Sequence, residues 1–268
     1  DKVYYKILWG VKEFKLSSRR TNKLLEMKKL KVVAAIVLSV SVFTSCVNIN
    51  PFDEPNPGNQ IEEIFNVNDF TEVDLVSAFE VLIIPGNQFR VTANGDERDI
   101  DDLNVRVINK KLKVNYLSRN FLSNIRRHRV DILIETPDLE AIEVSGAANV
   151  DIVDFAYFPD FIVDISGASK LYLDVKLGEL NAEISGASTI TLAQETPFIT
   201  ADLSGASKLN AYDANSEEAY LDLSGASRAN VAVSEYLQVN ASGASTVNYE
   251  GSPRIDQDLS GASKVKKK

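Results

Sequence analysis

Cysteine, histidine, methionine and tryptophan each occur once in the 268 residues of this chain. A single cysteine cannot form a disulfide within the chain, and one cysteine with one histidine cannot supply the four ligands of a structural zinc site. Catalysis by a Ser-His-Asp or Cys-His set would depend on His128 alone. Positive charge is also scarce, since 29 lysines and arginines face 38 acidic residues and give a net charge of −9. This balance repels phosphate backbones, so we expect no nucleic-acid partner.

A short apolar run near the amino end has the form of an export signal. Residues 32–43 are twelve uncharged, mostly apolar residues, and three lysines precede them within residues 28–31. Twelve residues are too few for a helix that spans a bilayer, which needs about 20, but they suit the apolar region of a signal peptide. Cys46 follows the run, as in the lipobox of bacterial lipoproteins, whose cysteine carries the lipid. We expect a signal peptide at 27–45 and a lipid on Cys46; the alternative is an ordinary signal peptide and a chance cysteine.

The remaining segments divide by composition. Residues 1–26 precede the single methionine, and we interpret them as a non-native upstream extension. From Cys46 onward the chain carries 19 basic and 35 acidic residues, hence a net charge of −16. Residues 46–60 are rich in proline, asparagine and acidic residues, which is typical of a flexible tether. Residues 61–268 have strand patterning and are interpreted as one continuous domain.

A tetrapeptide, Ser-Gly-Ala-Ser or once Ser-Gly-Ala-Ala, recurs at intervals of 18 to 21 residues. Its seven copies begin at Ser145, Ser166, Ser185, Ser204, Ser224, Ser242 and Ser260. Apolar and polar residues alternate before and after each copy, which predicts a strand on either side of the motif. A unit of about 19 residues with two short strands cannot bury its apolar face alone, so the copies must stack. The repeat therefore predicts an all-β solenoid of parallel coils over residues 141–268, capped by the irregular β-rich segment 61–140.

Each motif is predicted to form the corner between its two strands. The glycine permits the positive φ of a tight turn, and the serines can bond to nearby backbone or to the next coil. The alanine is expected where the two sheets converge. The predicted turn glycines are Gly146, Gly167, Gly186, Gly205, Gly225, Gly243 and Gly261.

The repeated motif, the acidic and apolar pair before it and the lipoprotein-like amino end resemble the putative auto-transporter adhesin, head GIN domain family of Gram-negative envelope proteins. The resemblance covers residues 64–268. It implies a right-handed parallel β-helix similar to pectin-lyase-type coils, and an adhesive role in the envelope. Similarity to trimeric adhesin heads would further imply a homotrimer.

Two residues before each motif stands a polar residue that is acidic in all copies but one. These acids are Glu143, Asp164, Glu183, Asp202, Asp222 and Asp258. Stacking would bring them into one outward row with a spacing of about 4.8 Å. The row could bind Ca²⁺, because carboxylate oxygens suit a hard cation, or it could be a solvated face that keeps the strand register; no other cofactor is expected. Basic residues just after the motif would offset part of the repulsion; they are Lys170, Lys208, Arg228 and Lys264.

Two further groups of residues are candidates for binding. The basic cluster 126–129 could contact anionic lipid headgroups near the membrane, although such a run is more often a solvated loop that pairs with acidic residues. Tyr172, Tyr212, Tyr220 and Tyr236 have outward parity, and exposed tyrosines are common anchors for sugars and protein partners. The tyrosines could equally cover the strand edges.

These patterns predict an outer membrane lipoprotein of a Gram-negative bacterium, exposed at the surface or facing the periplasm. Its solenoid is expected to bind a glycan, or a host or envelope protein, through its repeated faces and without catalysis. A structural spacer that faces the periplasm is the alternative. A polysaccharide-active enzyme is disfavoured, because the acidic residues are evenly repeated and no coil carries a distinct set.

Overall fold

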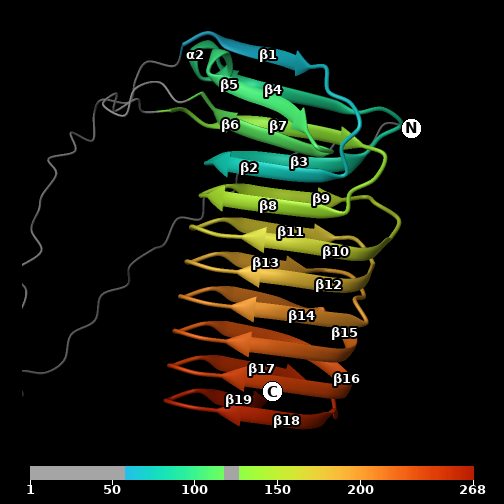
Figure 1. Cartoon of the computed structure of the whole chain (residues 1–268), viewed down its shortest axis with the longest axis vertical. Coiled ribbons are helices and arrows are strands. Elements are labelled where there is room, and N and C mark those ends of the chain that lie inside the picture. The colour runs from blue at the N-terminus through green and yellow to red at the C-terminus, as the bar shows by residue number, and fades with distance from the viewer. Residues whose placement is uncertain (1–57, 118–126) are drawn as a thin grey trace, which may run out of the picture. The chain divides into compact units, whose positions relative to one another are not determined.

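The computed structural model describes residues 58–117 and 127–268, and their regular secondary structure is almost entirely β-strand (Figure 1). The predicted signal peptide, Cys46 and nearly all of the tether lie outside these ranges. Helix α2 (Glu97–Asp101) has five residues, and no helix within the described ranges could span a bilayer.

The seven motifs each join two strands, as the alternation predicted. Flattened coils are stacked on one another, so that Figure 1 shows a ladder from β8 down to β19. Strands β15 and β16 are long because each runs without a break from the end of one motif to the start of the next. The strands are β8 (Ala141–Gly146), β9 (Asn149–Val153), β10 (Phe158–Ile165), β11 (Lys170–Asp174), β12 (Leu177–Ile184), β13 (Thr189–Leu192), β14 (Phe198–Leu203), β15 (Lys208–Leu223), β16 (Arg228–Ala241), β17 (Thr246–Glu250), β18 (Arg254–Leu259) and β19 (Lys264–Lys267).

Neighbouring coils pair in parallel and in register. Strand β10 lies between β8 and β12, and β11 lies between β9 and β13. Asp164 is opposite Glu143 on one side and Glu183 on the other. Residues at the same offset from the motif therefore face one another along the whole stack, and the predicted solenoid of parallel coils is confirmed.

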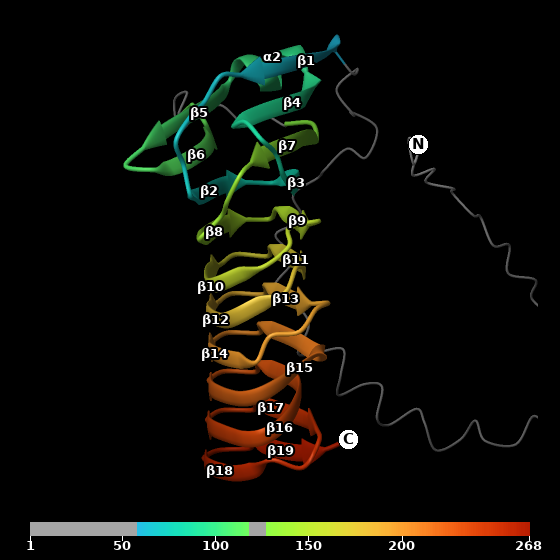
Figure 2. The same cartoon turned by 90° about the vertical axis from the view of Figure 1, so that its right-hand side faces the viewer.

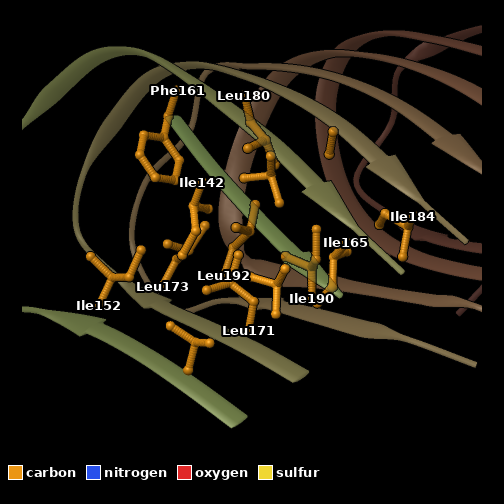
Figure 3. Packing of buried hydrophobic residues seen from close by; sticks show 14 of the residues in the cluster. Ile142, Ile152, Phe161, Ile165, Leu171, Leu173, Leu180, Ile184, Ile190 and Leu192 are labelled. Carbon is orange, nitrogen blue, oxygen red and sulfur yellow. The ribbon is translucent and has the colours of Figure 1, made fainter. Parts of the chain in front are cut away.

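The core is a ladder of apolar side chains between the two faces of each coil. Ile165 and Ile184 stack in the column just before the motif, and Leu171 and Ile190 stack in a column after it (Figure 3). Each of the four is at most 1% exposed. Full burial of one such side chain stabilises a fold by about 1.5–3 kcal/mol, so the repeated apolar columns are a main source of the stability of the solenoid.

At the end formed by β8 and β9, the stack is continued and capped by a segment that lacks the motif (Figure 2). Its elements are β1 (Gln60–Phe65), β2 (Glu72–Ser77), β3 (Phe79–Pro85), β4 (Arg90–Asp96), α2, β5 (Leu103–Ile108), β6 (Lys111–Tyr116) and β7 (Val130–Thr136). Strands β2 and β3 form a coil inserted between β6 and β7 above it and β8 and β9 below it, with parallel pairing throughout. Strand order in space thus differs from order in the chain.

Antiparallel pairing ends the stack within the cap. Strand β4 pairs antiparallel with β7 and with β1, and β5 pairs antiparallel with β6. At the far end, β18 and β19 each pair with a single strand, and four lysines lie on or beside β19. Charged residues at an open edge discourage pairing with other chains.

Candidate functional site

The turn glycine of the SGAS corner has positive φ in all seven coils. The predicted turn glycines, Gly146, Gly167, Gly186, Gly205, Gly225, Gly243 and Gly261, have φ between 69° and 99°. In six successive coils the N–H of the motif alanine donates a 2.7 Å hydrogen bond to the glycine carbonyl of the coil before. The corners are therefore stacked as regularly as the strands.

Close stacking explains why only glycine fits at these corners. A Cβ added to Gly205 would lie 2.6 Å from the carbonyl oxygen of Gly186. Its φ of 74° is also in the left-handed region, which side chains rarely adopt. The position is thus excluded to other residues by both conformation and space.

The burial within the motif differs from our expectation for alanine. The alanine side chain is exposed, and the fourth residue of the motif is the one that packs between the two sheets. Ser169, Ser188 and Ser207 are at most 1% exposed, and their hydroxyls have no hydrogen-bond partner in the described structure. Ala148 takes the same place in the first coil. The interior corner needs a small residue, and the alanine at the third position is instead a solvent-facing part of the turn.

The predicted acidic row is assembled by the strand register. Its members lie on adjacent coils in the order Glu143, Asp164, Glu183, Asp202, Asp222, Asn240 and Asp258. Asp74 and Lys113 of the cap continue the row beyond Glu143. The side chains point outward, and those from Asp164 to Asp258 are exposed.

Only the cap end of the acidic row is neutralised within the described residues. Lys111 bonds to Glu143 at 2.6 Å and to Glu72 at 3.0 Å, and these contacts raise the pKa of the lysine. Lys113 bonds to Asp74 at 2.8 Å. The row from Asp164 onward forms no ion pair with any described residue.

A groove of about 640 Å³ runs along the acidic row. The first serines of the motifs, such as Ser204 and Ser224, line it together with the carboxylates. The basic residues that were expected to offset the acids, including Lys208 and Arg228, lie on the opposite sheet across the corner and form no ion pair with them. The groove therefore keeps its negative charge. Calcium binding by its oxygens stays a prediction.

An aromatic ridge, which we define as Phe198, Tyr220 and Tyr236, lies on the same outward face as the acidic row. Phe198 and Tyr220 are 43% and 37% exposed, and the rings of Tyr220 and Tyr236 are 5.8 Å apart in an edge-on arrangement. The Tyr220 hydroxyl donates a 2.7 Å hydrogen bond to Glu218, which raises the pKa of that tyrosine. Because Glu218 lies opposite both Phe198 and Tyr236, the ridge crosses three coils.

The sequence identified only part of this ridge. Tyr220 and Tyr236 come together, whereas Tyr172 lies on the opposite sheet and Tyr212 lies beneath the ammonium group of Lys268 at 4.1 Å. Phe198 was missed, although it has the outward parity of Asp202 on the same strand. Extending the alternation back along β14 would have found it.

The cap holds a buried polar cluster that the sequence did not predict. Asp96, Asp99 and Asp102 are at most 5% exposed. Arg127 bonds to Asp99 at 3.3 Å and to Asp102 at 3.2 Å, and it stacks on the ring of Tyr116 at 3.6 Å. Burial raises the pKa of Tyr116 to about 12. Part of the predicted basic cluster is thus an internal ion-pair network; Arg126 lies outside the described residues.

His128 completes this cluster. Its backbone N–H donates to Asp99 at 2.8 Å, and its Nδ1 lies 3.2 Å from Asp99 and 3.5 Å from Asp96. One atom of each residue could in principle meet at a metal ion. Asp96, however, already accepts bonds from Arg98 and from the N–H of Gly58. We interpret the cluster as structural, because its carboxylates are already paired with cations and N–H groups. In the sequence, this cluster could have been suspected from the acids spaced three apart at 96, 99 and 102 and from the basic cluster 126–129 that could pair with them.

Three solved structures illustrate the likeness of this fold to known proteins. A putative adhesin from Bacteroides fragilis NCTC 9343 is 18% identical, with a TM-score of 0.68 and coverage of 78% of this chain and 97% of that one. A putative lipid binding protein from Parabacteroides distasonis ATCC 8503 is 16% identical, with a TM-score of 0.63 and the same coverage. A putative adhesin from Parabacteroides merdae ATCC 43184 is 14% identical, with a TM-score of 0.62 and coverage of 78% and 96%. At these identities the likeness establishes the fold.

Comparison at the level of sequence gives the family. No curated protein matches the chain significantly. The family model described as putative auto-transporter adhesin, head GIN domain matches residues 69–253, from just before β2 of the cap almost to the last coil. Since this match spans well over half of the chain and takes in the stacked SGAS corners, the chain belongs to the putative auto-transporter adhesin, head GIN domain family.

Proposed function

We propose that this chain is an exported lipoprotein whose solenoid is a non-catalytic, adhesin-like binding module on the outer membrane. The lipid on Cys46 would hold it to the membrane, and residues 46–60 would keep the solenoid away from the lipid surface. Membership of an adhesin family supports a binding role. The outward, regularly repeated surface of the coils supports the same role.

The aromatic ridge is the observation that carries this proposal. Phe198 and Tyr220 present large apolar rings to solvent on a flat strand face, although burial would stabilise them. Aromatic rings of this kind anchor ligands because they bury much area at low conformational cost. Glu218 and Thr200 lie beside the rings and offer hydrogen-bonding groups. Rings flanked by polar oxygens suit a sugar, whose faces are apolar and whose edges are hydroxyls.

Absence of catalysis is supported by the uniformity of the acidic row. A glycoside hydrolase needs two carboxylates in distinct environments, one to donate a proton and one to act as base or nucleophile. Here the row members from Asp164 onward share the same exposed position in each coil. His128, the single histidine, is held by Asp99 inside the cap.

A glycan array probed with the purified protein tests the proposal. The variant with Phe198→Ser and Tyr220→Ser should lose at least tenfold in affinity for the glycan that the wild type binds, because burying one large apolar side chain is worth about 1.5–3 kcal/mol and a tenfold change corresponds to about 1.4 kcal/mol. Tyr172→Ser is the matched control, since Tyr172 is 38% exposed but lies on the other sheet. Equal affinity of the ridge variant and the wild type would reject the ridge as the binding surface.

A further inference from the structure

The aspartates of the acidic row are matched by a basic residue six positions later in the sequence. Among the seven motif coils, wherever the row holds aspartate, that later position holds lysine or arginine. The cap coil differs, since Glu80 follows Asp74 at the same offset. The matched coils contain Asp164 with Lys170, Asp202 with Lys208, Asp222 with Arg228, and Asp258 with Lys264. The other coils have no basic residue there; they contain Glu143 with Asn149, Glu183 with Thr189, and the neutral pair Asn240 with Thr246.

Contacts within the chain do not account for this matching. Asp202 lies on β14 and points outward from one sheet, whereas Lys208 lies at the start of β15 in the opposite sheet. The SGAS corner separates the two side chains. No ion pair joins an acid of the row to a base of the matched set in the described structure. The two charged rows run side by side along the stack, one on each flank of the corner. The acids from Asp164 onward and the four bases form no ion pair with any described residue, so they are available to another molecule.

Symmetry decides which arrangement of two copies would pair these rows. If a second copy faces the corner after rotation about an axis parallel to the stack, the acidic flank of each copy meets the basic flank of the other. If the second copy is turned end over end, acid meets acid and base meets base. Closed two-fold assembly is the commonest form of homo-oligomer, and opposite charges across a contact select the parallel form.

Spacing and size also favour a parallel pair. Both copies have the same rise of about 4.8 Å per coil, so aligning one coil of each copy aligns all of their coils. The neutral residues Asn240 and Thr246 then face each other, and the four charged pairs occur on both sides of the axis. The exposed residues at the corner are serine, glycine and alanine, which allow close approach.

We propose that the SGAS edge binds a second copy of this chain, parallel and in the same register, with the acidic row of each copy against the basic row of the other. The groove of about 640 Å³ along the acidic row receives the lysine and arginine side chains of the neighbour. The aromatic ridge lies further from the corner than the acidic row, since Tyr220 precedes Asp222 on β15. The ridge therefore stays open for a ligand. The pairing goes beyond the proposed ligand-binding function and does not depend on it.

Charge reversal in the full-length protein tests the pairing. Lys208→Glu with Arg228→Glu gives a chain with two acidic flanks, and Asp202→Lys with Asp222→Lys gives a chain with two basic flanks. Sedimentation should find two chains per particle for the wild type, one for each variant alone, and two again when the variants are mixed. Asp160→Lys with Asp256→Lys is the control; both residues are exposed acids outside the row, and this variant should remain a dimer.

Other outcomes of the sedimentation experiment would overturn the proposal. These are a monomeric wild type, variants that remain dimeric, or a mixture that stays monomeric although each variant has the wild-type circular dichroism spectrum. The dissociation constant of the wild-type dimer should also rise at least tenfold in 1 M salt, where charges are screened beyond about 3 Å. A dissociation constant independent of salt would contradict pairing by charge.

Cysteine crosslinking tests the orientation separately. Ala187→Cys and Ala244→Cys place single thiols on exposed corners three coils apart, about 14 Å along the stack. Each variant should form a crosslinked dimer with a short bis-maleimide in a Cys46→Ser background, because equivalent corners meet only in a parallel pair. Crosslinking of one variant alone, or of neither, would overturn the parallel arrangement.

Discussion

The N–H of Ala206 donates a 2.7 Å hydrogen bond to the carbonyl oxygen of Gly186 in the preceding coil. The same bond links every pair of successive motifs, so the corner is a continuous ladder between the two sheets. Because corners cannot slip relative to one another, the strands on either side keep a fixed register. This register aligns residues about 19 positions apart in the sequence, and so forms the acidic row and the aromatic ridge.

Replacing a corner glycine should destabilise the stack. In Gly205→Val the positive φ alone should cost about 1–3 kcal/mol, and contact of the new Cβ with Gly186 adds to this. Thermal unfolding should show a clear fall in Tm. Ala206→Ser, at the exposed neighbouring position, should leave Tm within a degree or two. An unchanged Tm for Gly205→Val would contradict the account of the corner.

Buried serines at the interior corner should differ in their response to alanine. Ser188 has a buried hydroxyl without a partner, so Ser188→Ala should be neutral or stabilising by about 1 kcal/mol. Ser227 donates a 2.6 Å hydrogen bond to the carbonyl oxygen of Ser224, so Ser227→Ala should destabilise by about 0.5–1.5 kcal/mol. Denaturant unfolding of the two variants measures the difference. Equal losses at the two positions would show that both hydroxyls are paired in solution.

The buried cluster of the cap should make the free energy of unfolding depend on pH in the acid range. The hydrogen bond from Arg98, followed by backbone N–H groups, holds the pKa of Asp96 below its ordinary value of 3.8. A carboxyl with a lowered pKa stabilises the fold fully above its unfolded pKa, and this contribution is lost as pH falls through the folded pKa. Unfolding free energy should therefore fall less steeply below about pH 4 in Asp96→Asn than in the wild type.

A control separates this effect from general acid denaturation. Asp101→Asn changes an exposed acid at the last position of helix α2, which Asp96 caps, and should keep the slope of the wild type. If Asp96→Asn and Asp101→Asn give identical slopes below pH 4, Asp96 does not couple protonation to folding.

The solenoid itself could be predicted because one physical constraint repeats. Apolar residues such as Ile165 and Ile184 alternate with acids at a period of two, and the glycine of every motif marks a turn. Alignment on the motif serine gave the register, hence the acidic row. The alternation stops at the positive φ of the glycine, which is why the alanine was wrongly expected between the sheets in place of the fourth residue.

The cap could not be predicted in the same way. The coil of β2 and β3 pairs with β8 and β9, which follow it by some seventy residues, and no repeated motif marks that pairing. Asp99 and Arg127 likewise meet only through the fold. Charged residues in a non-repeating segment are predicted to be exposed, because only the tertiary structure shows which of them are paired and buried.

The most direct test of a surface binding role is whether the solenoid is exposed on intact cells. Intact cells would be treated with protease, the solenoid detected by antibody, and the peptide carrying Cys46 analysed for lipid by mass spectrometry. Loss of the solenoid while a lipidated Cys46 peptide remains on the cell is the result we predict. Full protection in intact cells, with cleavage only after lysis, would contradict the adhesin-like role and favour a spacer that faces the periplasm.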